Sequence, residues 1–249
     1  MKQQVSKQEI LDQLKKEILL LQGFKPAMTL NSDTVGLGSI ETAFPNAVFP
    51  KVGIHEFLIM QAEHTAASGG FIGGLLTPMM KNGAACLWIS AGRTLFPPAL
   101  KAFGVDPHRI IFIDLKREKD VLWAMEEALK CESLAAVVAE VQEIGLTASR
   151  RLQLTVEKSR VCGMVLRNDA RKLSTTACIA RWQITPLESE LEPGMPGLGF
   201  PRWKVELLKA RNGNPGVWTL EWSGGEFNNI KGCIAEPDHM SEIISKTAS

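Results

Sequence analysis

The stretch over residues 52–80, VGIHEFLIMQAEHTAASGGFIGGLLTPMM, has the layout of an anion-binding site. It predicts a buried strand over 54–60, a loop of small residues over 61–69 and a helix that begins at about Gly70. In a P-loop, successive backbone N–H groups and a helix N-terminus hold phosphate in this way. The stretch therefore predicts a vestigial P-loop, formed by Thr65, Ser68, Gly69 and Gly70.

The residues that give a P-loop its chemistry are missing. The pattern G-x-x-x-x-G-K-[ST] needs a Lys for the β- and γ-phosphates and a hydroxyl for Mg²⁺. If Gly69 is the second glycine, these two positions hold Gly70 and Phe71; if Gly70 is, they hold Phe71 and Ile72. Since neither register supplies the cation or the metal ligand, the sequence predicts no ATP hydrolysis, no catalytic residue and no cofactor.

Other candidates for metal or nucleotide chemistry are weak. Glu140 ends the apolar run over 134–141, where a Walker B carboxylate would stand. Without the P-loop Lys and hydroxyl, a lone carboxylate makes a poor Mg-nucleotide site, so Glu140 is interpreted as a vestigial Walker B residue. His55 and Glu56 are followed by Ile59, which excludes an H-E-x-x-H zinc motif, and the five cysteines lack C-x-x-C spacing. No metal site is predicted.

Composition excludes several classes of protein. The 249 residues are 45% hydrophobic and 22% charged, which is typical of a globular domain rather than a disordered chain. The formal charge of +1 gives no basic footprint for nucleic acid. No signal peptide and no apolar run of about 18 residues is apparent, so a cytoplasmic protein without a membrane segment is expected.

The order of the expected elements indicates how a site would be positioned. Strands are predicted over 54–60, 84–91, 110–114, 134–141 and 161–167, and helices over 94–103, from Asp120 and over 147–158. Strands that alternate with helices favour a parallel sheet. From residue 177 the pattern changes to strands over 178–185, 203–211 and 217–222, joined by turns. The predicted fold class is therefore α/β, with a mostly parallel central sheet and an antiparallel C-terminal extension.

Four regions are predicted along the chain. Residues 1–23 form an amphipathic helix whose apolar stripe consists of Ile10, Leu14, Ile18 and Leu21. Residues 24–50, rich in Pro, Gly, Ser and Asn, form a linker. Residues 51–222 form the core, and residues 223–249 a polar tail.

Several blocks of sequence resemble one bacterial family. They are LAAVVAEVQEIGLTASRRLQL over 134–154, GIHE over 53–56, ARW over 180–182 and FPRWKVELLKARNGNPGVW over 200–218. These blocks are similar to the ImuA family, the RecA-like accessory proteins of damage-induced mutagenesis. The resemblance covers roughly residues 50–222. It implies a three-layer RecA-like fold and a non-catalytic adapter that docks RecA, an ImuB-type polymerase-like partner, or both, within an error-prone translesion polymerase assembly.

A docking surface can be suggested from the same resemblance. Lys209 and Arg211 lie on a segment that resembles the RecA strand reaching toward a neighbouring subunit, so they are predicted to bind a partner together with the N-terminal stripe. The other reading, two solvated cations on an edge strand, stays open. The segment after Arg167 is short beside the second DNA-binding loop of RecA, which predicts weak or absent binding of single-stranded DNA.

Two other functions and the oligomeric state stay open at this point. One function is a SulA-type inhibitor of cell division, another RecA-like protein that has lost its P-loop. The other is a nucleotide-binding RecA-like ATPase regulator, which would have to hold triphosphate without a Lys. A homo-oligomer is compatible with the sequence.

Overall fold

A computed structural model describes residues 13–14, 17–18, 34–81, 83–92, 95–168, 174–190 and 199–230. Of the predicted N-terminal stripe, Leu14 and Ile18 fall within these ranges, are helical and are 48% and 50% exposed. Ile10 and Leu21 lie outside the described residues. The role of the stripe in binding a partner therefore stays a prediction.

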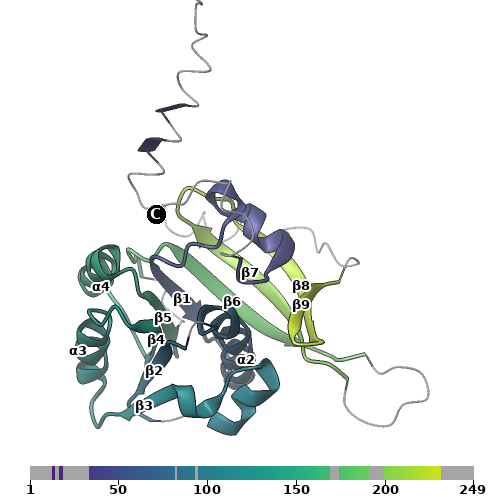
Figure 1. The fold of residues 1–249 in the computed structure, drawn as a ribbon, viewed down its shortest axis with the longest axis horizontal. Coiled ribbons are helices and arrows are strands. Elements are labelled where there is room, and N and C mark those ends of the chain that lie inside the picture. Colours follow the sequence, from purple (N-terminus) through teal and green to yellow (C-terminus); the bar gives the residue numbers. More distant parts are fainter. Residues whose placement is uncertain are drawn as a thin grey trace, which may run out of the picture.

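A nine-stranded sheet organises the molecule, in the order β3-β2-β4-β5-β1-β6-β7-β8-β9 (Figure 1). The strands from β3 to β6 in this order pair in parallel, and β7, β8 and β9 continue the sheet with antiparallel pairing. The strands are β1 Ile54–Leu58, β2 Ala85–Ser90, β3 Ile110–Asp114, β4 Leu134–Val141, β5 Cys162–Arg167, β6 Ala180–Leu187, β7 Arg202–Ala210, β8 Gly216–Ser223 and β9 Glu226–Asn229. The predicted α/β fold class is confirmed.

Helices cover both faces of this sheet. Helix α2 (Ala62–Met79) lies on one face, and α3 (Glu118–Ala128) and α4 (Leu146–Ser159) lie on the other (Figure 1). Between the sheet and α2 lies a core rich in aromatic side chains, whereas an aliphatic core lies beneath α3 and α4. The three layers are consistent with a RecA-like fold. The remaining helical segments are the 3₁₀ turns η1 Gly38–Ala43, η2 Pro45–Ala47, η3 Pro97–Phe103 and η4 Pro107–Arg109.

The end of the predicted linker is part of the core, so the boundary at residue 50 is wrong. Ile40, Phe44 and Phe49 are 0%, 4% and 1% exposed, and the Phe44 ring lies 5.7 Å from that of Trp182. The buried Glu41 carboxyl accepts hydrogen bonds from the backbone N–H groups of residues 35 and 37, at 3.0 and 3.2 Å. The Pro, Gly and Asn residues predict a linker, but the apolar residues between them drive this segment into the core.

The predicted tail also begins inside the sheet. Strand β9 pairs with β8, and the Phe227 ring packs against Trp222 and Phe71 with centroids 4.9 and 5.2 Å apart. The core therefore extends past residue 222 to Asn229. The polar sequence Glu-Phe-Asn-Asn carries a single apolar side chain, so it gives little signal for a strand. No helix among the described residues is long and apolar enough to cross a membrane.

Candidate functional site

The loop predicted over residues 61–69 is helical from Ala62 onward. Strand β1 ends at Leu58 and α2 begins at Ala62, so Thr65, Ser68, Gly69 and Gly70 all lie within the helix. From the second turn onward, the backbone N–H groups of a helix bond to carbonyl groups one turn earlier and cannot surround a phosphate. The prediction of a P-loop-like loop over 61–69 is therefore wrong. The alanines at 62, 66 and 67 favour helix strongly enough to shorten the connection to three residues.

The glycines of α2 serve close packing. A Cβ atom at Gly70 would lie 2.6 Å from the Phe103 ring, and one at Gly74 would lie 2.4 Å from the Phe227 ring. The segment η3 is held against α2 by the Thr77 hydroxyl, which donates to the Phe103 carbonyl at 2.7 Å. The Trp222 indole N–H holds it too, by donating to the Ala102 carbonyl at 2.9 Å. The glycines of α2 therefore allow this helix to pack closely against η3 and against β8–β9.

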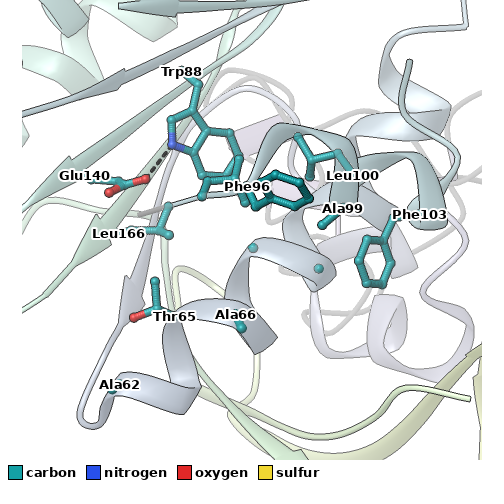
Figure 2. Close-up of a pocket in the computed structure, with 13 residues that line it drawn as sticks. Ala62, Thr65, Ala66, Trp88, Phe96, Ala99, Leu100, Phe103, Glu140 and Leu166 are labelled. Carbon is teal, nitrogen blue, oxygen red and sulfur yellow. Dashed lines mark hydrogen bonds between the residues drawn. The ribbon is translucent and has the colours of Figure 1, made fainter. Parts of the chain in front are cut away.

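Four of the five vestigial nucleotide-site residues nevertheless meet around one pocket of about 410 Å³ (Figure 2). It opens between the first half of α2, the segment η3 and the carboxyl-terminal halves of β2, β4 and β5. The lining residues are Ala62, Thr65, Ala66, Gly69, Gly70, Trp88, Leu95, Phe96, Ala99, Leu100, Phe103, Glu140 and Leu166. Ser68, the fifth predicted residue, is fully buried and does not line the pocket.

The sequence did not point to the other wall of this pocket. Leu95, Phe96, Ala99, Leu100 and Phe103 come from one segment that was predicted only as a short helix. The tetrapeptide Phe-Pro-Pro-Ala over 96–99 marks that segment, but nothing in its pattern shows that it faces α2. This wall forms only in the folded chain, where the larger side chains of residues 95–103 pack against the glycines of α2.

The chemistry of the pocket differs from that of a nucleotide site. The Glu140 side chain, 4% exposed, accepts a hydrogen bond from the Trp88 indole N–H at 2.7 Å (Figure 2). Among the described residues of its lining there is no Lys, Arg or His, and the only other polar side-chain group there is the Thr65 hydroxyl. A phosphate site needs positive potential and N–H donors. This pocket instead offers apolar walls and one acidic group.

A second buried carboxyl, Glu56 on β1, is the centre of an ion-pair cluster. One oxygen lies 3.4 Å from a terminal nitrogen of Arg167 on β5, and the other lies 2.8 Å from Nε of Arg181 on β6. The side chains of Glu56 and Arg167 are 0% and 1% exposed, and that of Arg181 is 14% exposed. The Thr176 hydroxyl donates to Glu56 at 2.9 Å. Two positive groups and a hydroxyl thus compensate for the burial of this charge.

This cluster anchors the crossover between β5 and β6, named here the crossover segment (residues 168–179). Parallel strands need such a crossover, and a helix usually makes it, because a helix satisfies its own backbone groups. The described part of the crossover segment contains no helix. Side chains satisfy several of its backbone groups: Arg181 donates to the Ser174 carbonyl at 2.8 Å, and Ser149 accepts from the Ala177 N–H at 2.9 Å.

Lys209 and Arg211 hold the same segment. Lys209 Nζ donates to the Thr176 carbonyl at 3.0 Å, and the Arg211 guanidinium donates to the Ala177 carbonyl at 2.8 Å. Partial burial lowers the pKa of Lys209, as do the positive charges of Arg181 and Arg211. Strand β7 lies between β6 and β8, so the reading of two solvated cations on an edge strand is wrong. A role for this pair in binding a partner stays a prediction.

His55 lies next to Glu56 on β1 but is kept neutral. Its Nδ1 accepts from the Trp182 indole N–H at 3.2 Å, its Nε2 donates to the Pro50 carbonyl at 2.9 Å, and Phe49 stacks on it at 4.5 Å. Burial lowers the pKa of His55 to about 4, against the opposing effect of the hydrogen bond to Pro50. Within the described ranges, no group of three or more His, Cys, Asp and Glu side chains could hold a metal ion.

Comparison with known proteins gives two relatives. No protein-family model matches the chain. Two curated proteins do match, both named Protein ImuA, from the strains NA1000 / CB15N and ATCC 19089 / CIP 103742 / CB 15 of Caulobacter vibrioides. Each is 36% identical to this chain over 198 residues, which span 75% of the chain and 81% of the relative.

Proposed function

The chain belongs to the ImuA family, and on this basis we propose that it is a non-catalytic adapter in DNA-damage-induced translesion synthesis. Family membership associates the chain with damage-induced mutagenesis. The finer part of the proposal is that it docks RecA, an ImuB-type polymerase-like partner, or both. An adapter keeps the surfaces of a RecA-like domain without needing its hydrolytic site, since function depends on the site and not on the fold alone.

The observation that carries the proposal is the shape of the β1–α2 junction. Three residues separate Leu58 from Ala62, which leaves no loop to surround a triphosphate. The place where the phosphates would lie is lined by apolar side chains and by the acidic Glu140. The described lining residues supply no cation for a triphosphate, which disfavours its binding there. ATP turnover is correspondingly not expected.

Docking is assigned to the N-terminal stripe of Ile10, Leu14, Ile18 and Leu21. Leu14 and Ile18 each expose about half of their surface, as expected for the apolar face of a helix that packs on a partner. Because Lys209 and Arg211 bond to the crossover segment, their charged groups contribute less to the proposed docking surface than the stripe does.

Two measurements on the full chain test this function. Isothermal titration with Mg-ATP, with and without single-stranded DNA, is expected to give no saturable heat. Saturable binding in either titration would replace the adapter by a nucleotide-regulated protein. In co-purification, RecA or an ImuB-type partner is expected to be retained by the unmodified chain.

Substitutions in the stripe test where the partner binds. The double change Leu14→Glu and Ile18→Glu is expected to reduce retention of the partner at least tenfold. The control is Leu154→Glu on α4, where an equally large apolar side chain is 43% exposed outside the stripe. Full retention by the double variant would refute the docking assignment. If no partner is retained at all and overexpression makes cells filamentous, an inhibitor of cell division is the better description.

A further inference from the structure

The face of the sheet that carries α3 and α4 is open beyond the crossover segment. The aliphatic core beneath these helices draws its described strand residues from β1 to β5, and none of them from β6, β7, β8 or β9. Figure 1 shows α3 and α4 on the far side of β1 from β7 and β8. An antiparallel sheet can expose one face to water, so the open face as a whole needs no occupant.

A bulge in β7 places an apolar pair on this open face. Between Leu207 and Lys209 the register with β6 shifts by one residue, which leaves Leu208 as the extra residue of the bulge. Val217 on β8 lies opposite Glu206, so it is a diagonal neighbour of Leu208. Because Leu207 faces the aromatic core, Leu208 and Val217 face the other side of the sheet. They are 39% and 42% exposed.

Two positively charged side chains border this apolar pair. Lys209 follows Leu208 directly, and Arg211 lies two residues further along the chain. Each donates to a carbonyl group of the crossover segment, and within the described part of the chain neither forms an ion pair with a carboxylate. A carbonyl group is a neutral acceptor, and both side chains have further N–H donors for an acidic group. Leu208, Lys209, Arg211 and Val217 are named here the bulge patch.

The chain itself continues next to the bulge patch. The Ile230 N–H, just after β9, donates to the Thr219 carbonyl at 3.0 Å, and Val217 lies two residues from Thr219 on β8. Residues 231–249, named here the C-terminal segment, follow and lie outside the described residues. The connection over 231–239 can span about 30 Å at about 3.3 Å per residue, so the residues after it can reach the patch.

The sequence of the C-terminal segment is complementary to the bulge patch. Over 232–245 it contains no Lys or Arg and three acidic residues, which are Glu236, Asp238 and Glu242. Its larger apolar residues at the spacing of one helix face are Met240, Ile243 and Ile244. An apolar stripe bordered by acidic groups matches two apolar side chains bordered by cations.

We propose that the C-terminal segment folds back onto the bulge patch. Its apolar stripe packs on Leu208 and Val217, and its acidic side chains lie against Lys209 and Arg211. Because the segment belongs to the same chain, its effective concentration at the patch is in the millimolar range, so modest contacts suffice. A partner that binds the two cations must first displace the segment. This inference goes beyond the adapter function, which does not require the contact.

The test measures hydrogen exchange of the full chain by mass spectrometry. The reference is a synthetic peptide with the sequence of residues 231–249. Amides of residues 240–246 are expected to exchange at least tenfold more slowly in the full chain than in the peptide. The protection is expected to remain on hundredfold dilution, because the contact lies within one chain.

A substitution in the bulge patch tests the surface. Leu208→Glu removes an apolar contact and adds a charge of the same sign as the segment, so exchange over 240–246 is expected to approach that of the peptide. The matched control is Leu187→Glu, at the last residue of β6 and far from Lys209, which pairs with the beginning of that strand. Leu187 is 41% exposed, and its substitution is expected to leave the protection unchanged.

A second variant tests the segment and leaves every described contact intact. Asp238→Lys combined with Glu242→Lys places positive charges opposite Lys209 and Arg211. It is expected to reduce the protection at least tenfold, while the amides of β6–β9 exchange as in the unmodified chain.

Exchange over 240–246 at the rate of the peptide would overturn the proposal and leave the patch to an external partner. Protection lost on dilution would assign the contact to a second copy of the chain, which also overturns it. So would unchanged protection in Leu208→Glu or in the charge-reversed segment, or an equal loss in Leu187→Glu. Retention of RecA or an ImuB-type partner is scored separately, so failure of this contact is distinguishable from failure of the adapter function.

Discussion

Two buried acidic residues on central strands of this sheet have different surroundings. Glu56 lies between two guanidinium groups and a hydroxyl, which together hold the crossover segment. Glu140, 4% exposed, accepts from a neutral indole N–H and lines an apolar cavity. The comparison shows that a buried ion-pair cluster stabilises the crossover segment, whose described residues contain no helix. The region whose sequence suggested phosphate chemistry is the apolar one.

The difference between the two sites is tested most directly by replacing each Glu with Gln and comparing the losses of stability. Glu56→Gln leaves two guanidinium groups without their counter-charge, and breaking a buried ion pair costs about 3–5 kcal/mol. Glu140→Gln keeps an acceptor for Trp88 and leaves the Glu56 ion pairs intact, so it is expected to cost less than Glu56→Gln. Urea unfolding followed by Trp fluorescence measures both free energies. Equal losses for the two variants would show that the two sites do not differ as described.

The neighbours His55 and Glu56 on β1 also differ, because His55 is buried without a counter-charge. This difference is expected to appear in the pH dependence of stability. Its pKa is about 4 in the folded protein against 6.5 for the ordinary group, so the unfolded chain binds the proton more readily. His55 therefore contributes stability above pH 6.5, which is lost as the pH falls toward 4. The complete loss, reached only below pH 4, corresponds to about 3.5 kcal/mol at about 1.4 kcal/mol per pKa unit.

The measurement is the free energy of unfolding between pH 7.5 and pH 4.5, with two variants. His55→Phe keeps an aromatic ring on Phe49 and is expected to flatten this pH dependence, even if it lowers the stability at pH 7. His108→Asn is the comparison at an exposed histidine, since the His108 side chain is 80% exposed and pairs with the exposed Asp106 at 2.7 Å, and it is expected to change the slope less than His55→Phe does. An unaltered slope in His55→Phe would assign the pH dependence to other groups.

The smallest of the three effects concerns the glycines. If Gly70 belonged to an open loop, Gly70→Ala would be tolerated, and in a free helix it would stabilise by about 1 kcal/mol. Because its Cβ would lie 2.6 Å from the Phe103 ring, we expect a loss of about 1–3 kcal/mol in the free energy of unfolding. Gly92→Ala, with no atom within 4 Å, is expected to change stability by about 0.5 kcal/mol or less. A stabilised Gly70→Ala variant would contradict the packing role.

Much of the fold could be predicted because its central strands are buried on both faces. Such strands appear as continuous apolar runs, and the predicted strands over 110–114 and 134–141 coincide with β3 and β4. The shift to antiparallel strands after residue 177 was also visible, since turn residues separate shorter segments there. Strand β9 and the segment over 35–49 were missed because their local patterns are weak and their apolar residues find partners far away in the chain.

The candidate site was predicted less completely. The sequence identified Thr65, Gly69, Gly70 and Glu140, and the structure brings them around one pocket. It could not identify the opposite wall over 95–103, because no local period shows which element a segment will face. Nor could it show that Lys209 and Arg211 bond to carbonyl groups of the crossover segment, since those groups lie more than thirty residues away.

By itself, the sequence determined the α/β class, the loss of the P-loop Lys and hydroxyl, and the resemblance to the ImuA family. These depend on local apolar periodicity and on residue identity at fixed spacing. Only the tertiary structure decided that Gly69 and Gly70 lie inside α2, that Glu56 belongs to an ion-pair cluster and that Glu140 lines a largely apolar pocket. Whether a segment forms a helix or a loop, and whether a buried carboxyl joins an ion-pair cluster or lines a pocket, depends on which distant side chains pack against it. Packing of this kind is a property of the folded chain.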